Sequence, residues 1–140
     1  AEDETFQIGK AQFLSEGTDV TVIACGHLVW HAVVAGQELE KRGISVEVIN
    51  MHTIKPLDVD AILKSVGKTK CVVTAEEHQR NGGLGDAVAQ VLIQNKPYPQ
   101  EYVAVNDSFG ESGTPDQLLE KYGLMPKDII AAAEKVMARK

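Results

Sequence analysis

The chain has 140 residues, of which 44% are hydrophobic and 24% charged, and its formal net charge is −6. This composition suits one soluble globular domain with a packed core. The negative charge, with no local cluster of Lys and Arg, argues against nucleic acid and anionic lipid as partners. The sequence contains no long apolar run and no signal-peptide pattern, so no membrane span is predicted.

The first two predicted strands follow an acidic leader at residues 1–7. Residues 9–14 form a short strand, and residues 19–26 form a β-branched strand. The tight turn between them predicts that these two strands are antiparallel neighbours. Cys25 and Cys71 each end an apolar run, so both are predicted to be buried thiols in a reducing cytoplasm.

The next elements alternate between helix and strand periods. A helix is predicted over residues 27–43, a strand over 44–51, and a second helix over 58–67 with Asp58 as its N-cap and Gly67 as its end. In the first helix, the apolar positions that recur at helical spacing and should face the core are Leu28, Ala32, Ala35 and Leu39.

The second half continues the alternation. Strands are predicted over residues 70–77 and 101–107, and helices over 83–95, from Pro115, and over 126–140. Strands separated by helices, with connections long enough for crossovers, predict a mostly parallel sheet that is covered on both faces. Because the first strand is antiparallel, the expected fold is an α/β domain with a mixed five-stranded sheet.

Three glycines crowd between a predicted strand and a predicted helix: Gly82, Gly83 and Gly85. Glycines at such a place let backbone N–H groups approach an anion, and the helix N-terminus adds partial positive charge. The spacing is neither the dinucleotide fingerprint G-x-G-x-x-G nor a P-loop. A small-anion site and a tight turn with close helix packing are therefore both open interpretations.

Glu76, Glu77 and His78 lie at the carboxyl end of a predicted strand, where open α/β sheets bind ligands. A Glu beside a His suits acid–base work, but adjacent residues of a strand point to opposite faces. An interface contact is therefore favoured, and no catalytic residue is predicted. His27 and His31 have the spacing of metal ligands without a third ligand nearby, so no metal site is predicted.

The sequence resembles the C-terminal domain of transketolase from about Ile8 to its end. IGKAQFLSEGTDVTVIACG, a helix, GISVEVINMHTIKPLD, VVTAEEHQRNGGLGDAV and FGESGTPDQLLEKYGL keep the order of that domain. The resemblance implies a three-layer α/β/α domain over residues 8–140, with a five-stranded mixed sheet whose first strand is antiparallel to the others.

The resemblance also implies a parent activity. Transketolases transfer a two-carbon ketol unit between sugar phosphates with thiamine diphosphate and a divalent cation, Mg²⁺ or Ca²⁺. In the family, an N-terminal and a middle domain hold these groups, and both domains are missing from this sequence. The domain itself is therefore expected to bind no cofactor and to be inactive alone.

The partners implied by the resemblance are the missing domains, or a separate subunit that carries them, in a homodimeric cytoplasmic enzyme of the pentose phosphate pathway. The domain is expected to support subunit association and the middle domain, and Glu77, His78, Gly82, Gly83 and Gly85 are its candidate interdomain contacts or anion-binding residues. The alternatives are the similar C-terminal domain of a 2-oxoacid dehydrogenase β subunit or of deoxyxylulose-phosphate synthase, or a small-anion-binding regulatory module.

Overall fold

The structure is a computed structural model that describes residues 8–79, 82–105, 115–121 and 123–140. The predicted leader and the last two residues of the predicted fifth strand lie outside these ranges. The elements are β1 (Gln12–Ser15), β2 (Val20–Ala24), α1 (Leu28–Lys41), β3 (Val46–Asn50), α2 (Val59–Thr69), β4 (Val72–Gln79), α3 (Leu84–Gln94), β5 (Gln100–Val105), α4 (Pro115–Lys121) and α5 (Pro126–Met137).

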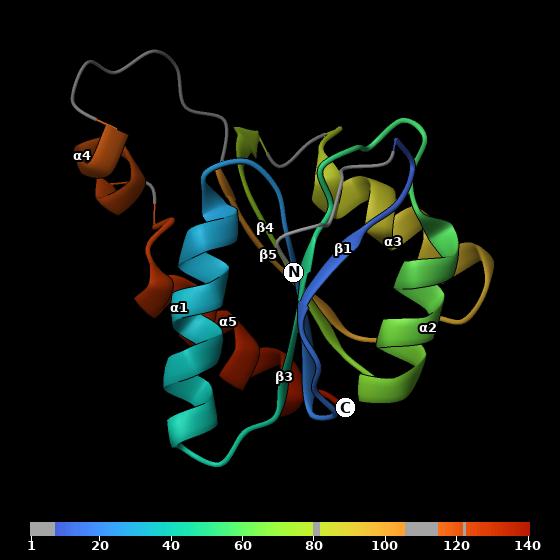
Figure 1. Cartoon of the computed structure of the whole chain (residues 1–140), viewed down its shortest axis with the longest axis horizontal. Helices are drawn as coiled ribbons and strands as arrows, with labels where there is room; N and C mark the ends of the chain where they lie inside the picture. Colours follow the sequence, from blue (N-terminus) through green and yellow to red (C-terminus); the bar gives the residue numbers. More distant parts are fainter. Residues whose placement is uncertain (1–7, 80–81, 106–114, 122) are drawn as a thin grey trace.

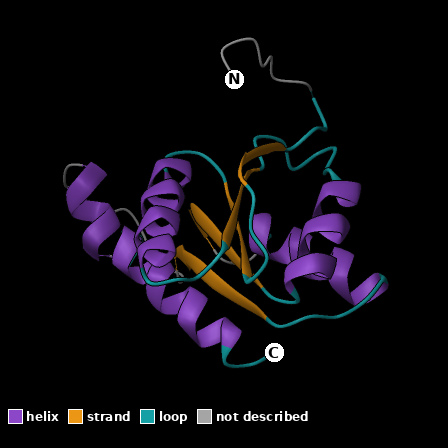
Figure 2. Cartoon of the chain, turned by 60° about the horizontal axis from the view of Figure 1, so that its bottom comes forward, coloured by secondary structure: helices purple, strands orange, loops and turns teal. Residues whose placement is uncertain are grey.

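The five strands form one sheet in the order β1-β3-β2-β4-β5. β2, β3, β4 and β5 run parallel, and β1 runs antiparallel to β3. Figure 1 and Figure 2 show α1 and α5 on one face of the sheet and α2 and α3 on the other. The predicted three-layer α/β/α fold with a mixed five-stranded sheet is therefore confirmed.

Two apolar clusters, one on each face of the sheet, form the core. β2 is central, and all five of its residues are buried, as expected for a parallel strand covered on both sides. Val22 belongs to the cluster under α1 and α5, whereas Ile23 belongs to the cluster under α2 and α3. The four predicted core positions of α1 are all fully buried, which confirms the helical stripe. No helix in the described ranges is long and apolar enough to span a membrane.

The prediction that the first two strands are neighbours was wrong, because β1 pairs with β3. The connection from β1 to β2 crosses the start of β3, and Gly17 of this connection packs against the backbone of Val46 and Glu47. A Cβ on Gly17 would lie 2.2 Å from the Val46 carbonyl carbon. The Gly17 N–H donates to Oε1 of Glu47 at 3.1 Å. Because Gly17 has no side chain, the connection from β1 to β2 can cross over β3. The short turn in the sequence had instead predicted a hairpin of the first two strands.

The predicted end of α2 at Gly67 was also wrong, because α2 continues to Thr69. Thr69 is fully buried, and its hydroxyl lies 2.6 Å from that of Thr21 on β2. Lys70 then takes the left-handed conformation that ends the helix, with φ of 71°. The predicted N-cap is confirmed, since the Asp58 carboxylate accepts a hydrogen bond from the Ala61 N–H at 3.1 Å.

Candidate functional site

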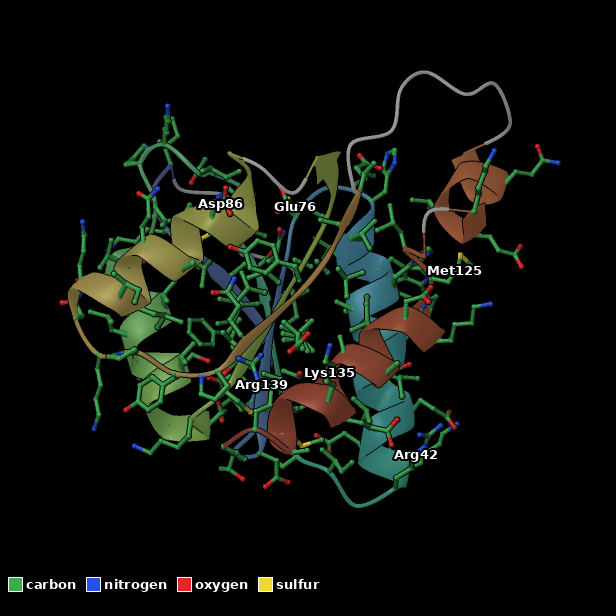
Figure 3. The ribbon with its side chains drawn as sticks, turned by 180° about the vertical axis from the view of Figure 1, so that it is seen from behind. Arg42, Glu76, Asp86, Met125, Lys135 and Arg139 are labelled. Carbon is green, nitrogen blue, oxygen red and sulfur yellow. The ribbon has the colours of Figure 1, made fainter. Side chains whose placement is uncertain are left out.

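The candidate residues lie at the carboxyl edge of the sheet, where β2 and β4 end beside one another. Ala24 of β2 pairs with Ala75 of β4, so the residues after these two positions meet at this edge. Figure 3 shows Glu76, in the second half of β4, and Asp86, in the first turn of α3, at the same end of the sheet. Two carboxylates therefore flank the glycine turn.

Glu76 is fully buried beneath the N-terminus of α3. Its Oε1 accepts a hydrogen bond from the Leu84 N–H at 2.9 Å, and its Oε2 accepts one from the Gly85 N–H at 2.8 Å. N–H groups in the first turn of a helix lack partners within the helix and favour negative charge. The N-terminus of α3 thus binds a carboxylate of its own chain.

Asp86 holds the start of the same turn. Its Oδ2 accepts a hydrogen bond from the Gly82 N–H at 2.7 Å, and its Oδ1 accepts one from the Tyr102 hydroxyl at 2.8 Å. Gln100 of β5 donates from Nε2 to the Gly85 carbonyl oxygen at 2.9 Å. The turn is therefore fixed from below by β4 and from the side by β5.

Gly85 is required by close packing rather than by a special backbone angle. A Cβ there would lie 2.4 Å from Cε2 of Tyr102 and 3.0 Å from Oγ1 of Thr74. Only Gly82 takes a positive φ, of 80°, among the glycines of this turn. These contacts support a tight turn with close helix packing, and the small-anion interpretation of Gly82, Gly83 and Gly85 stays a prediction.

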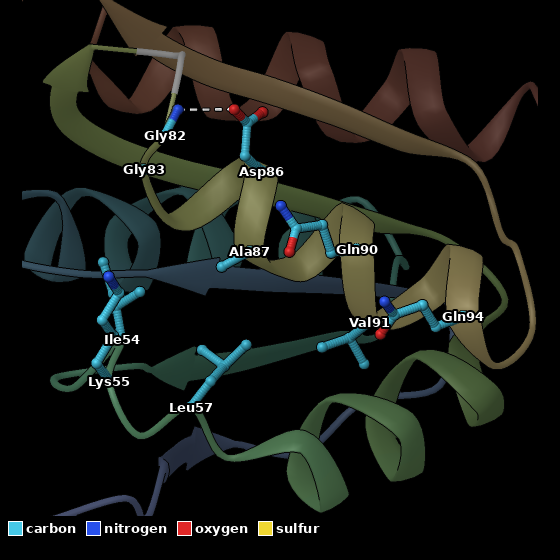
Figure 4. A pocket seen from close by; sticks show the side chains of 10 residues that line it. All are labelled: Ile54, Lys55, Leu57, Gly82, Gly83, Asp86, Ala87, Gln90, Val91 and Gln94. Atoms are coloured by element: carbon cyan, nitrogen blue, oxygen red, sulfur yellow. Dashed lines mark hydrogen bonds between the residues drawn. The ribbon is translucent and has the colours of Figure 1, made fainter.

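A pocket of about 440 Å³ lies between the glycine turn and the loop from β3 to α2 (Figure 4). Lys55 lines one side, whereas Asp86, Gln90 and Gln94 line the other. Lys55 is exposed, and the lining also contains the carboxylate of Asp86 from α3. This mixed lining gives the pocket no clear preference for an anion.

Glu77 points away from Glu76, as the strand alternation predicts. Its Oε2 lies 3.1 Å from Nδ1 of His27, the residue just before α1. Gly26, with φ of +62°, leaves room for this pair, since a Cβ there would lie 3.3 Å from Oε1 of Glu77. His78 belongs to β4, but its side chain lies outside the described residues. Glu77 therefore joins the end of β4 to the start of α1.

The two histidines with metal-ligand spacing do not converge. His31 directs Nδ1 to the Leu124 carbonyl oxygen at 2.9 Å, whereas His27 pairs with Glu77. Within the described ranges, no group of three His, Cys, Asp or Glu side chains could hold a metal ion. The N–H groups of Gly82, Leu84 and Gly85 already donate to Asp86 and Glu76, so these three donors do not fit the diphosphate of thiamine diphosphate.

Both cysteines are free and buried, as predicted. Burial, followed by the negative charges of Glu76 and Glu77, raises the pKa of Cys25 to about 11. Burial also raises the pKa of Cys71. A raised pKa disfavours the thiolate form, which is the nucleophilic form of cysteine.

An apolar groove beside this edge was missed in the sequence. It has a volume of about 660 Å³ and lies between β1 and the first turns of α1. Trp30 is 68% exposed and Leu14 is 39% exposed, and Val29 and Val33 complete its apolar lining. The sequence held a usable signal, because Trp30 falls outside the buried stripe of α1. Exposed aromatic residues grouped with aliphatic ones mark interaction surfaces.

The fold is a three-layer α/β/α domain in which carboxylates at the carboxyl edge of the sheet accept hydrogen bonds from the glycine turn of the same chain. Residues 9–129 match the family model described as transketolase, C-terminal domain, and the chain belongs to this family. It is 49% identical over 140 residues to a 6-deoxy-6-sulfo-D-fructose transketolase subunit of Clostridium sp. (strain MSTE9).

Two further comparisons show how wide the similarity is. A solved structure described as a split gene transketolase, inactive beta4 tetramer, is 46% identical, with a TM-score of 0.93 over 99% of this chain. A 1-deoxy-D-xylulose-5-phosphate synthase of Geobacter sulfurreducens is 37% identical over 135 residues, which cover 95% of this chain and 21% of the synthase.

The chain spans less than half the length of the two transketolase relatives named above. It covers 44% of the Clostridium subunit and 45% of the split-gene chain. More than half of each relative therefore has no counterpart in these 140 residues.

Proposed function

We propose that the chain is the C-terminal domain of a transketolase and that its own role is to associate with the rest of the enzyme rather than to catalyse the reaction. The observation that carries this proposal is the groove around Trp30, on a chain that spans less than half of its relatives. The groove is lined by His27, which pairs with Glu77, so Glu77 would lie beside the proposed contact surface.

The parent enzyme would transfer a two-carbon ketol unit between sugar phosphates. Thiamine diphosphate with Mg²⁺ or Ca²⁺ supplies that chemistry when bound, and the missing N-terminal and middle domains, or a separate subunit, would hold both groups. This chain would pack against the middle domain and help to hold a homodimer. We place the enzyme in the cytoplasm and in the pentose phosphate pathway as part of the same proposal, and the domain boundary at residue 8 is also a prediction.

Trp30 is the expected centre of the contact. A tryptophan buried at an interface is a frequent binding hot spot, and its truncation often costs about 2 kcal/mol or more. Each 1.4 kcal/mol corresponds to a factor of ten in affinity, so Trp30→Ala should weaken association by roughly 30-fold. The stability of the domain should change little, because Trp30 is 68% exposed.

A chimera tests the proposal. This chain would replace the matching segment of the Clostridium subunit, and the chimera would be assayed for thiamine-dependent ketol transfer with the complementary subunit of that enzyme. We expect ketol transfer and a normal oligomer from the chimera, and weaker assembly in analytical ultracentrifugation from its Trp30→Ala variant. Gln37→Ala is the matched control, since Gln37 is an exposed residue two turns further along α1.

Two results would contradict the proposal. One is tight binding of thiamine diphosphate and Mg²⁺ to the 140-residue chain in isothermal titration, or ketol transfer by that chain alone. The other is assembly of the Trp30→Ala chimera with an affinity equal to that of the unchanged chimera.

The alternatives concern the parent enzyme and the glycine turn. The synthase relative at 37% identity supports a deoxyxylulose-phosphate synthase as the second candidate, and a 2-oxoacid dehydrogenase β subunit is the third. Chimeras with the corresponding enzymes distinguish these three parents. A small-anion-binding module at the glycine turn, next to the pocket that Gly83 lines, is the other candidate, and it predicts that phosphate or sugar phosphates raise the melting temperature of the chain.

A further inference from the structure

We propose that Glu76 is the resident anion of the glycine turn: a positioning residue whose buried carboxylate fixes the turn and closes the N-terminus of α3 to phosphate and other external anions. This inference goes beyond the proposed function and does not depend on the identity of the parent enzyme.

The carboxylate of Glu76 has the surroundings of a bound ligand. It is fully buried, and each of its oxygens accepts one backbone N–H bond from α3, at 2.9 and 2.8 Å. No Lys, Arg or His side chain of the described ranges forms an ion pair with it. A buried carboxylate is costly unless it is compensated, so the two N–H groups and the helix dipole are its main compensation.

The position of Glu76 in β4 directs its side chain toward the glycine turn. Thr74 and Glu76 lie on the same side of β4, and Thr74 lies close to Gly85. The pairing of β4 with β5 is irregular between Ala75 and Gln79, and such irregularities redirect side chains at the end of a strand. A shift of one residue would place Glu77 under α3 instead, so the register of β4 selects the carboxylate that binds.

An external anion would have to displace Glu76. Phosphate needs the same N–H groups that helix N-termini offer in phosphate-binding proteins, and those of Leu84 and Gly85 are already engaged. The Gly82 N–H is engaged by Asp86. A second anion beside two carboxylates would also meet like-charge repulsion. The N–H groups of Gly82, Leu84 and Gly85 are therefore already occupied by carboxylates of the chain itself.

Chemical rescue tests the assignment. The chain, Glu76→Ala and Glu76→Gln would be compared in sodium formate, sodium phosphate and sodium chloride at equal ionic strength. The melting temperature reports stability, and the ¹H–¹⁵N signals of the Leu84 and Gly85 amides report the hydrogen bonds. Glu77→Ala is the matched control, because it removes the neighbouring carboxylate that points to the other face.

We expect neither formate nor phosphate to shift the two amide signals of the unchanged chain. Glu76→Ala should melt about 5 °C or more below it, and formate should raise that temperature and return both amide signals toward their original positions. Glu76→Gln, which fills the same space, should melt lower without responding to formate. Glu77→Ala should keep both signals and show no rescue.

Three results would overturn the proposal. Phosphate could shift the Leu84 and Gly85 signals of the unchanged chain, which would show that the turn is open. Glu76→Ala could keep both signals in chloride, or could fold and show no response to formate. If Glu76→Ala does not fold, Glu76→Gln decides, since unchanged amide signals in that variant would exclude a charged partner.

Discussion

Gly85→Ala should destabilise the domain although it adds only one methyl group and removes a glycine from a helix. The new Cβ would lie 2.4 Å from Cε2 of Tyr102, closer than carbon atoms approach without movement, and 3.0 Å from Oγ1 of Thr74. Tyr102 is held in place by its hydroxyl bond to Asp86 at 2.8 Å. Relief of the clash therefore requires either a shift of α3 or loss of that bond.

The change in the free energy of unfolding depends on two destabilising effects and one stabilising effect. Overpacking in a closely packed site costs about 1–3 kcal/mol, and loss of a hydrogen bond to a charged group costs about 1.5–3 kcal/mol. Alanine is favoured over glycine in a helix by about 1 kcal/mol, which offsets part of this. Because the clash is relieved by one route or the other, these two costs are alternatives, and we expect a net loss of about 1–2 kcal/mol, which lowers the urea midpoint by about 0.5–1 M for a typical small domain.

Gly67→Ala is the matched control. Gly67 lies inside α2 with nothing within 4 Å of a built Cβ, so the same change there should stabilise the domain by about 0.5–1 kcal/mol. Urea denaturation followed by far-ultraviolet circular dichroism is the appropriate assay. Trp30, the one tryptophan, is too exposed to report unfolding well by fluorescence.

A double-mutant cycle separates the steric effect from a general loss of helix stability. In a Tyr102→Ala background the ring is absent, so Gly85→Ala should cost little or should stabilise. An equal cost of Gly85→Ala in both backgrounds, or a stability equal to that of Gly67→Ala, would refute the steric account of this turn.

Three further predictions concern the interior. Burial by itself raises the pKa of Glu47, but its hydrogen bonds, led by the one from Lys68, outweigh burial and lower that pKa. Glu47→Gln should therefore lower the free energy of unfolding by about 2 kcal/mol at pH 7 in urea titrations. The difference between the two proteins should disappear as the pH falls through the lowered folded-state pKa of Glu47. Cys25, with a pKa raised to about 11, should react with iodoacetamide at pH 8 only as fast as the domain unfolds, and rapid labelling of the folded chain would contradict this. Gly17→Ala should cost about 3 kcal/mol or more, because its Cβ would meet the backbone at Val46, which moves less readily than a side chain; a normal melting temperature would refute the crossing over β3.

Periodic features of this fold were predictable because they depend on local sequence. The buried stripe of α1 and the Asp58 cap follow from helical spacing and from side-chain chemistry within one turn. The position of β1 was not predictable in this way, since it depends on the fit of Gly17 against a strand far along the chain. The true end of α2 depends likewise on the contact of Thr69 with β2.

The candidate site shows the same division between local and long-range information. The sequence placed Glu76 and Glu77 on opposite faces of a strand, which the structure confirms, but it ended that strand at Glu77, whereas β4 continues to Gln79. The role of Glu76 was missed, because its partners Leu84 and Gly85 follow only after the chain has turned back. Trp30 could be placed on the outer face of α1, but its neighbour Leu14 comes from β1, whose position was not predictable.

Successive side chains of β4 point to opposite faces of the sheet, so Glu76 and Glu77 contact different helices. Glu76 points to α3 and fixes the turn from within, while Glu77 points to the start of α1 and pairs with His27 beside the Trp30 groove. A turn held by its own carboxylate needs no ligand in order to be rigid, and a rigid edge loses little conformational entropy when a partner binds. In our proposal, the glycine-rich segment that suggests a phosphate site in the sequence thus fixes one side of the end of β4, and the contact surface on α1 lies on the opposite face of the sheet.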